Sequence, residues 1–89
     1  YHQRSYHMNK KRMTKGTPVR LTVTANFCHN IINSKGYSIR QRAKGEILTY
    51  LGKQIPGLED HWSNYYVFLC ENGSNCAIEK GNRHYLEVI

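Results

Sequence analysis

The sequence predicts a single all-β domain, and three observations carry this prediction. Residues 19–24 alternate apolar and polar side chains, the period of two that gives a strand one buried face and one wet face. The Asn72-Gly73 pair separates two runs of β-forming residues, and it is a strong hairpin signal because both residues tolerate positive φ. A chain of 89 residues has room for one domain with one modest core.

The chain begins with a polar and basic stretch at residues 1–15. It has no apolar periodicity, so we expect a disordered, flexible arm there. Met8 and the Asn-Lys-Lys-Arg run after it resemble a natural start, so we interpret residues 1–7 as residues added to the natural chain and exclude them from the fold. The folded domain is expected to cover residues 16–89. The candidate polyanion contacts of the arm are its cations Lys10, Lys11 and Arg12.

The first strand is predicted over residues 16–25. Pro18 lacks a donor for the strand ladder, which suits the first residue of a strand or a sheet edge. Residues 26–37 are predicted as a long connection that ends in a turn. Its apolar side chains, Phe27, Ile31 and Ile32, are expected to fold back onto the core.

Residues 38–52 allow two interpretations. A strand over residues 44–51 would place Ile47, Thr49 and Leu51 on one face. A helix at about 39–51 would begin with Ser38 as its N-cap and would make the fold α+β. Gly45 would lie inside that helix at a cost of about 1 kcal/mol relative to alanine. We favour the strand, and the helix stays open as the alternative.

The last third of the chain is predicted as a loop, a hairpin and a final strand. The loop covers residues 53–63, where Pro56-Gly57 marks a turn. Residues 65–70 pair with residues 76–79 in the hairpin. After a turn at 80–82, residues 84–89 form the last strand. The expected total is therefore five short strands.

Five short strands in this order resemble an SH3-like small β-barrel. The residues that carry the resemblance are Gly-Thr-Pro-Val-Arg-Leu at 16–21, Lys-Gly-Glu-Ile at 44–47 and Tyr-Leu-Glu-Val-Ile at 85–89. Similar placements occur in KOW-type nucleic-acid modules and in the barrels inserted in superfamily-one helicases. They also occur in the barrel subunits of photosystem I and ferredoxin–thioredoxin reductase. The resemblance covers residues 16–89 and implies an architecture that several functions share.

The charge balance favours an anionic partner. Thirteen lysines and arginines against six acidic residues give a net charge of +7. We expect a non-catalytic binding module for nucleic acid, DNA or RNA. The alternative is a small protein-interaction or regulatory subunit that docks on an acidic patch of a larger enzyme. Cations neutralise phosphates and aromatic rings stack on bases. Beyond the arm, the candidate contacts are Lys35, Tyr37, Arg40, Arg42, Lys44, Tyr50 and Trp62.

Catalysis and membrane association have little support in the sequence. The chain has no phosphate-binding glycine loop and no Gly-x-Ser-x-Gly motif, so we expect neither an enzyme nor a small-molecule substrate. It has no apolar run of about 20 residues, the length that spans a bilayer. Without a recognisable signal peptide, the protein is expected to be soluble and cytoplasmic, with no membrane partner.

The three cysteines form an odd set, which favours reduced thiols. The soft ligands suffice in number for zinc, but no Cys-x-x-Cys pair is present, so no metal and no cofactor is expected. These ligands are Cys28, His29, Cys70, Cys76 and His84. Cys70 and Cys76 flank the hairpin turn, so a cross-strand disulfide remains an alternative if register brings their Cβ atoms to about 4 Å.

Overall fold

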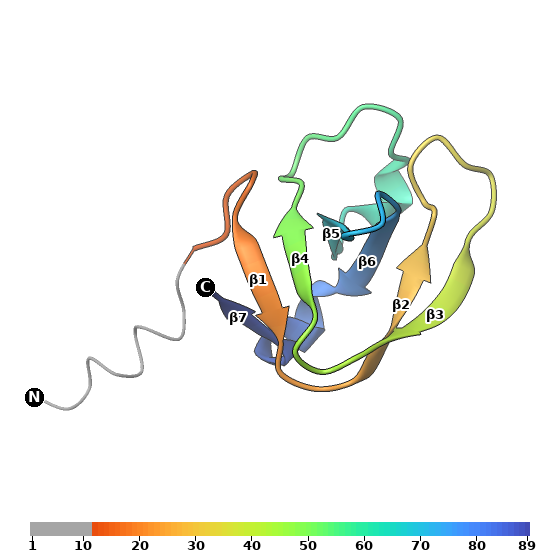
Figure 1. The fold of residues 1–89 in the computed structure, drawn as a ribbon. Coiled ribbons are helices and arrows are strands. Elements are labelled where there is room, and N and C mark those ends of the chain that lie inside the picture. Colours follow the sequence, from red (N-terminus) through yellow and green to blue (C-terminus); the bar gives the residue numbers. More distant parts are fainter. Residues whose placement is uncertain (1–11) are drawn as a thin grey trace, which may run out of the picture.

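The computed structural model describes residues 12–89, and their main feature is one antiparallel sheet of seven strands (Figure 1). The strand order is β3-β2-β6-β5-β4-β1-β7. The strands are β1 (Pro18–Leu21), β2 (Ala25–His29), β3 (Ser38–Arg42), β4 (Ile47–Tyr50), β5 (Tyr65–Leu69), β6 (Asn75–Glu79) and β7 (Leu86–Val88). Two short 3-10 helices, η1 (Asp60–Trp62) and η2 (Lys80–Tyr85), are the only helices in this part of the chain. The all-β prediction is confirmed. Residues 1–11 of the predicted arm lie outside the described residues.

The strand predicted over residues 16–25 is two strands with different partners. β1 ends at Leu21 and pairs with β4 and β7, whereas β2 begins at Ala25 and pairs with β3 and β6. The predicted connection over residues 26–37 is therefore wrong at its start. Phe27 and His29 are buried, and Cys28 between them is less so, which is ordinary strand alternation. The sequence did not show this alternation, because the core-facing position 29 is a histidine rather than an apolar residue.

Residues 38–52 also form two strands, β3 and β4, so the helical alternative is wrong. The strand interpretation holds, but the strand predicted to begin at residue 44 begins at Ile47. A turn separates β3 from β4, and the Glu46 amide donates to the Ala43 carbonyl at 3.1 Å to close it. β3 then pairs along its whole length with β2, from Ser38 to Arg42. The additional strands β2 and β3 bring the count to seven instead of the expected five.

The predicted hairpin is confirmed. β5 and β6 pair from Tyr65↔Glu79 to Leu69↔Asn75. The Gly73 amide donates to the Cys70 carbonyl at 2.9 Å, and Gly73 has φ of 88°. Glycine populates that region without the steric cost that other residues meet there.

Apolar side chains pack on both faces of this hairpin. Phe68, which is fully buried, belongs to the larger cluster. Val67, the next residue along β5, belongs to the second cluster, where it packs with Ile31, Trp62 and Ala77. The larger cluster consists of Val19, Leu21, Phe27, Leu48, Tyr50, Phe68, Cys70, Cys76, Ile78 and Leu86. The two clusters hold the strands that present the surface residues described next.

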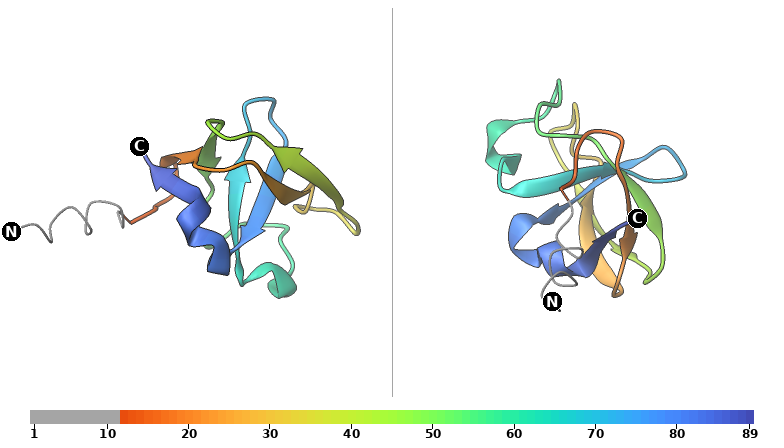
Figure 2. Two further views of the ribbon diagram at one scale, coloured as in Figure 1. Left: turned by 90° about the horizontal axis from the view of Figure 1, so that it is seen from below. Right: turned by 90° about the vertical axis from the view of Figure 1, so that its left-hand side faces the viewer.

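β1 lies between strands from distant parts of the chain. Figure 2 shows η2 leading into β7, which lies beside β1. β1 pairs with β7 through Val19↔Val88 and with β4 through Val19↔Leu48. This arrangement brings residues 12–17, the end of β4 and η2 into one neighbourhood.

Candidate nucleic-acid interface

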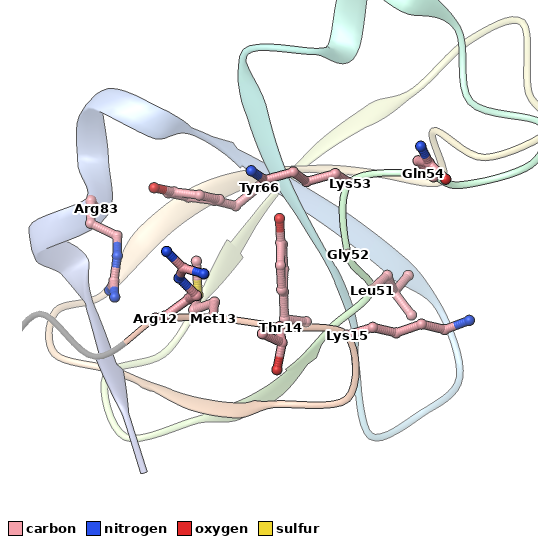
Figure 3. A pocket seen from close by; sticks show the side chains of 11 residues that line it. Arg12, Met13, Thr14, Lys15, Leu51, Gly52, Lys53, Gln54, Tyr66 and Arg83 are labelled. Atoms are coloured by element: carbon pink, nitrogen blue, oxygen red, sulfur yellow. The ribbon is translucent and has the colours of Figure 1, made fainter.

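A groove of about 910 Å³ opens where residues 12–15, residues 51–54 and η2 meet (Figure 3). We call it the basic groove, because none of the described residues that line it is Asp or Glu. The cations that line it are Arg12, Lys15, Lys53 and Arg83.

The wall formed by residues 12–17 is fixed to the end of β4 by backbone bonds. The Gly16 amide donates to the Tyr50 carbonyl at 2.8 Å, and the Tyr50 amide donates to the Thr17 carbonyl at 2.9 Å. Gly52 has φ of 89°, and a Cβ at this position would lie 3.3 Å from the Cβ of Lys15. The positive φ and this close approach favour glycine between Leu51 and Lys53. Lys15 and Lys53 are thereby held on adjacent segments.

A tyrosine ring forms part of the groove between its cations. In Figure 3 the Tyr66 side chain reaches across the groove toward Arg83, whereas Lys15 extends away from them. The Tyr66 ring packs edge-on against Tyr50, with their centroids 6.0 Å apart. The Lys80 Nζ lies 5.9 Å from the Tyr66 ring centroid. Arg83 also donates to the Leu86 carbonyl at 3.4 Å. The groove therefore combines an aromatic ring with cations from three separate segments.

The cations predicted within residues 35–44 lie elsewhere. We call this stretch, which contains β3, the basic strand. β3 and β7 stand at the two ends of the strand order, so the basic strand is separated from the basic groove (Figure 1). The predicted contacts that are exposed in it are Lys35, Tyr37, Arg40 and Lys44. These four residues are accessible to a partner, as the prediction requires.

Arg42 differs from the other cations of the basic strand. Its Nε donates to Glu46 Oε2 at 2.6 Å, and its Nη2 binds the same oxygen. Its Nη1 lies 3.4 Å from His29 Nε2. Only 17% of the Arg42 side chain is exposed. The structure therefore places Arg42 in an internal polar contact rather than on the outer surface.

Tyr50 and Trp62 are both inside the protein. Tyr50 is 3% exposed and Trp62 is 5% exposed. The Tyr37 ring contacts Trp62 edge-on, with centroids 5.2 Å apart, and Tyr37 itself remains 57% exposed. Of these three predicted stacking residues, Tyr37 is the one whose ring is accessible. Burial, with a smaller contribution from Tyr66, raises the pKa of the Tyr50 hydroxyl, which adds no negative charge to the groove near neutral pH.

Sequence reasoning missed Lys53 and Arg83 of the groove, and it did not predict that Lys15 and Tyr66 lie beside them. They are distant in the sequence, and none belongs to a motif. The sheet order β5-β4-β1 brings their segments together. Of the predicted contacts, Arg12 and the largely buried Tyr50 line the groove, whereas Lys10 and Lys11 lie outside the described residues.

Three of the five candidate metal ligands converge. His29, Cys70 and Cys76 are buried, and their ligand atoms lie within 4.8 Å of one another. Cys70 and Cys76 are free thiols with their Sγ atoms 3.2 Å apart. Cys28 packs against the second cluster and His84 is exposed, so these two are not part of the group.

Comparisons with known proteins found no matching family model, no matching curated protein and no matching solved structure. Within residues 12–89, the protein has no helix with the length and apolar character that a membrane span requires.

Proposed function

We propose that the protein is a non-catalytic module that binds nucleic acid, with its phosphate backbone in the basic groove. The observation that carries this proposal is a groove with four lining cations and no acidic residue among its described lining residues. Cations that neutralise phosphates release condensed counterions, which supplies most of the sequence-independent affinity. The net charge of +7 adds long-range attraction to the same partner.

The arrangement of the cations favours a chain of phosphates over one small anion. Arg12, Lys53 and Arg83 belong to separate segments around an open groove, and Lys15 extends away from them. Several phosphates along one strand can each meet a cation in such an arrangement. Tyr66 offers a ring in the groove wall, where an unpaired base can stack. The basic strand, with exposed Tyr37, Arg40 and Lys44, is a second contact surface for a longer nucleic acid.

We also propose that the architecture is related to the SH3-like small barrels. The three segments that carry the resemblance belong to neighbouring strands. Residues 16–21 contain β1, residues 44–47 lead into β4, and residues 85–89 contain β7. In the sheet, β1 lies between β4 and β7. Segments that are remote in sequence thus form one continuous part of the sheet, as a shared structural motif would.

The test is a binding titration at several salt concentrations. Fluorescence anisotropy with labelled single-stranded DNA, duplex DNA and single-stranded RNA would give the affinity of each. For each neutralised phosphate, we expect log K to fall by about 0.9 per decade of salt for duplex DNA and about 0.7 for single strands. Absence of binding to all three at about 50 mM salt, where phosphate contacts are strong, would refute the proposal.

A matched pair of variants tests the groove itself. Lys53→Gln removes one groove charge, whereas Arg20→Gln removes one charge from the exposed Arg20–Glu87 pair on β1 and β7. Both variants lower the net charge by one, so an effect of overall charge would weaken nucleic-acid binding equally in both. We expect the salt dependence to become shallower for Lys53→Gln and to stay near the parent value for Arg20→Gln. Equal effects would argue against the groove as the contact surface.

A protein partner is the second candidate, and the edge of the sheet favours it. Within the described chain β3 pairs with β2 alone, and Ile39 on β3 is 58% exposed. An extended acidic segment of a partner can add to such an edge as a further strand, while Arg40 supplies charge complementarity. NMR titration with poly-glutamate would then shift the amides of β3. An oligonucleotide that binds the basic groove would instead shift the amides of residues 12–15 and 51–54.

A further inference from the structure

A buried group of metal-binding side chains lies apart from the residues of the basic groove. His29 is 2% exposed, Cys70 is 2% exposed and Cys76 is fully buried. One ligand atom from each of the three lies within 4.8 Å of the other two. Two sulfurs and one imidazole nitrogen at one point are the ligand types that select zinc and other thiophilic ions.

Strand register explains why these three residues meet. His29 on β2 pairs with Cys76 on β6, and Cys76 pairs with Phe68 on β5. Cys70 follows Phe68 by two residues and so faces the same side of the hairpin. Cys28 is adjacent to His29 on β2 and faces the other side, against the second cluster. The strand register thus places two of the three cysteines, Cys70 and Cys76, beside His29.

We propose that His29, Cys70 and Cys76 form a zinc site with three protein ligands and one exchangeable fourth ligand. Two cysteines and one histidine form an established ligand set for such open zinc sites. With zinc–sulfur bonds of about 2.3 Å, two thiolates in tetrahedral geometry lie about 3.8 Å apart. The Cys70 and Cys76 sulfurs are 3.2 Å apart, so they must separate by roughly half an ångström.

Charge balance favours a divalent ion. Zinc replaces the protons of two neutral thiols, giving one zinc dithiolate and two released protons, so the net charge of the site does not change. This balance matters because an unpaired charge in a buried site costs several kcal/mol. Because zinc binding releases two protons, zinc affinity should rise with pH.

The contacts of the imidazole leave His29 available to a metal. Its contact with Arg42 is long, at 3.4 Å, and Arg42 has a closer partner in Glu46. His29 can exchange this contact for a metal bond while the Arg42–Glu46 pair stays intact.

The first experiment measures metal binding to the full chain. Protein kept under a thiol reductant would be stripped with a chelator and titrated with Co²⁺ and then with Zn²⁺. We expect one ion per chain, sulfur-to-cobalt charge transfer in the near ultraviolet, and the intense visible bands of tetrahedral cobalt. X-ray absorption of the zinc-loaded protein should show two sulfur and two nitrogen or oxygen neighbours. Lack of saturable binding, or a coordination shell without sulfur, would overturn the proposal.

Variants then assign the ligands. Cys28→Ser is the matched control, because it removes a thiol outside the buried group. It should keep parental zinc affinity and parental cobalt bands. Cys76→Ser and His29→Gln should lower the affinity for zinc by more than about 100-fold. Loss of a residue that only hydrogen-bonds to a metal ligand lowers affinity less than this. If Cys28→Ser weakens zinc binding as much as Cys76→Ser does, then His29, Cys70 and Cys76 do not form the site. Should a variant fail to fold, the sulfur count of the parent protein still decides.

Discussion

The basic groove and the basic strand carry similar charge, but the fold uses that charge differently. In the basic strand the cations are neighbours in the sequence, and Arg42 is already bound to Glu46 and close to His29. In the basic groove the cations come from remote segments and meet because β5, β4 and β1 are adjacent. A dense run of cations in a sequence therefore does not show which cations a partner can reach. Strand order and internal pairing decide it.

The largest expected effect comes from removing two cations from the basic groove. Arg12→Ala with Lys53→Ala should weaken binding about 100-fold at 50 mM salt and flatten the salt slope by about 1.4–1.8. These values correspond to two lost phosphate contacts. Lys35→Ala with Arg40→Ala removes the same charge from the basic strand and should have a smaller effect. Anisotropy titrations of both variants on the same oligonucleotide would measure the difference. A larger loss for the basic-strand pair would reverse the comparison.

The next effect separates Arg42 from its exposed neighbour Arg40. Arg42→Ala should lower the free energy of unfolding by about 1–3 kcal/mol, because it leaves the partly buried Glu46 carboxylate without its partner. Arg40→Ala should change it by less than about 0.5 kcal/mol, as expected for an exposed side chain. Urea unfolding would measure both. Equal stabilities would mean that Arg42 is as free for a partner as Arg40.

A smaller effect is expected at Tyr37. If a single strand reaches the basic strand, Tyr37→Ala should weaken its binding by about 1 kcal/mol, the lower end of the range for base stacking. We choose the lower end because the ring already contacts Trp62 with one edge. Duplex binding, in which the bases are already stacked, should change less. If Tyr37→Ala leaves the affinity for single strands unchanged, single strands bind in the basic groove without contacting Tyr37.

The smallest effect is the pH dependence of the free energy of unfolding. It concerns His29 on β2, the strand that pairs with β3 of the basic strand. The pKa of His29 is lowered from 6.5 in the folded protein, so below pH 6.5 the unfolded chain binds more protons. The free energy of unfolding should therefore fall as pH drops through 6.5 and level off below the folded pKa. Urea midpoints at pH 7, 6 and 5 would show this trend, and His29→Gln should reduce it. If the trend is unchanged in His29→Gln, other titratable groups cause the pH dependence.

Local signals in the sequence predicted local structure well. Asn72-Gly73 identified the hairpin, because the turn depends on a glycine with positive φ within the turn itself. β2 was missed because His29 occupies a core-facing position that a pattern of apolar residues does not show. β3 and β4 were taken as one segment, although Gly45 lies at the turn between them.

The candidate site was harder to predict than the fold. Arg12 and the exposed residues of the basic strand were identified from local charge, and they lie on the surface. Lys53 and Arg83 were not identified, because only the order of strands in the sheet makes them neighbours. Trp62 and Tyr50 were expected to stack on bases, but the small domain uses both rings to fill its interior.

The pairing of β1 with β7 has a consequence for how the chain folds during synthesis. The β5–β6 hairpin joins nearby residues and can form as soon as they leave the ribosome. β1 is made much earlier, but its Val19 must wait for Val88. At about 5–20 residues per second this delay lasts several seconds. During this time the apolar side of β1 lacks one of its two neighbouring strands. A nascent chain in this state is an expected client for chaperones, and early termination before β7 would leave β1 as an unprotected edge.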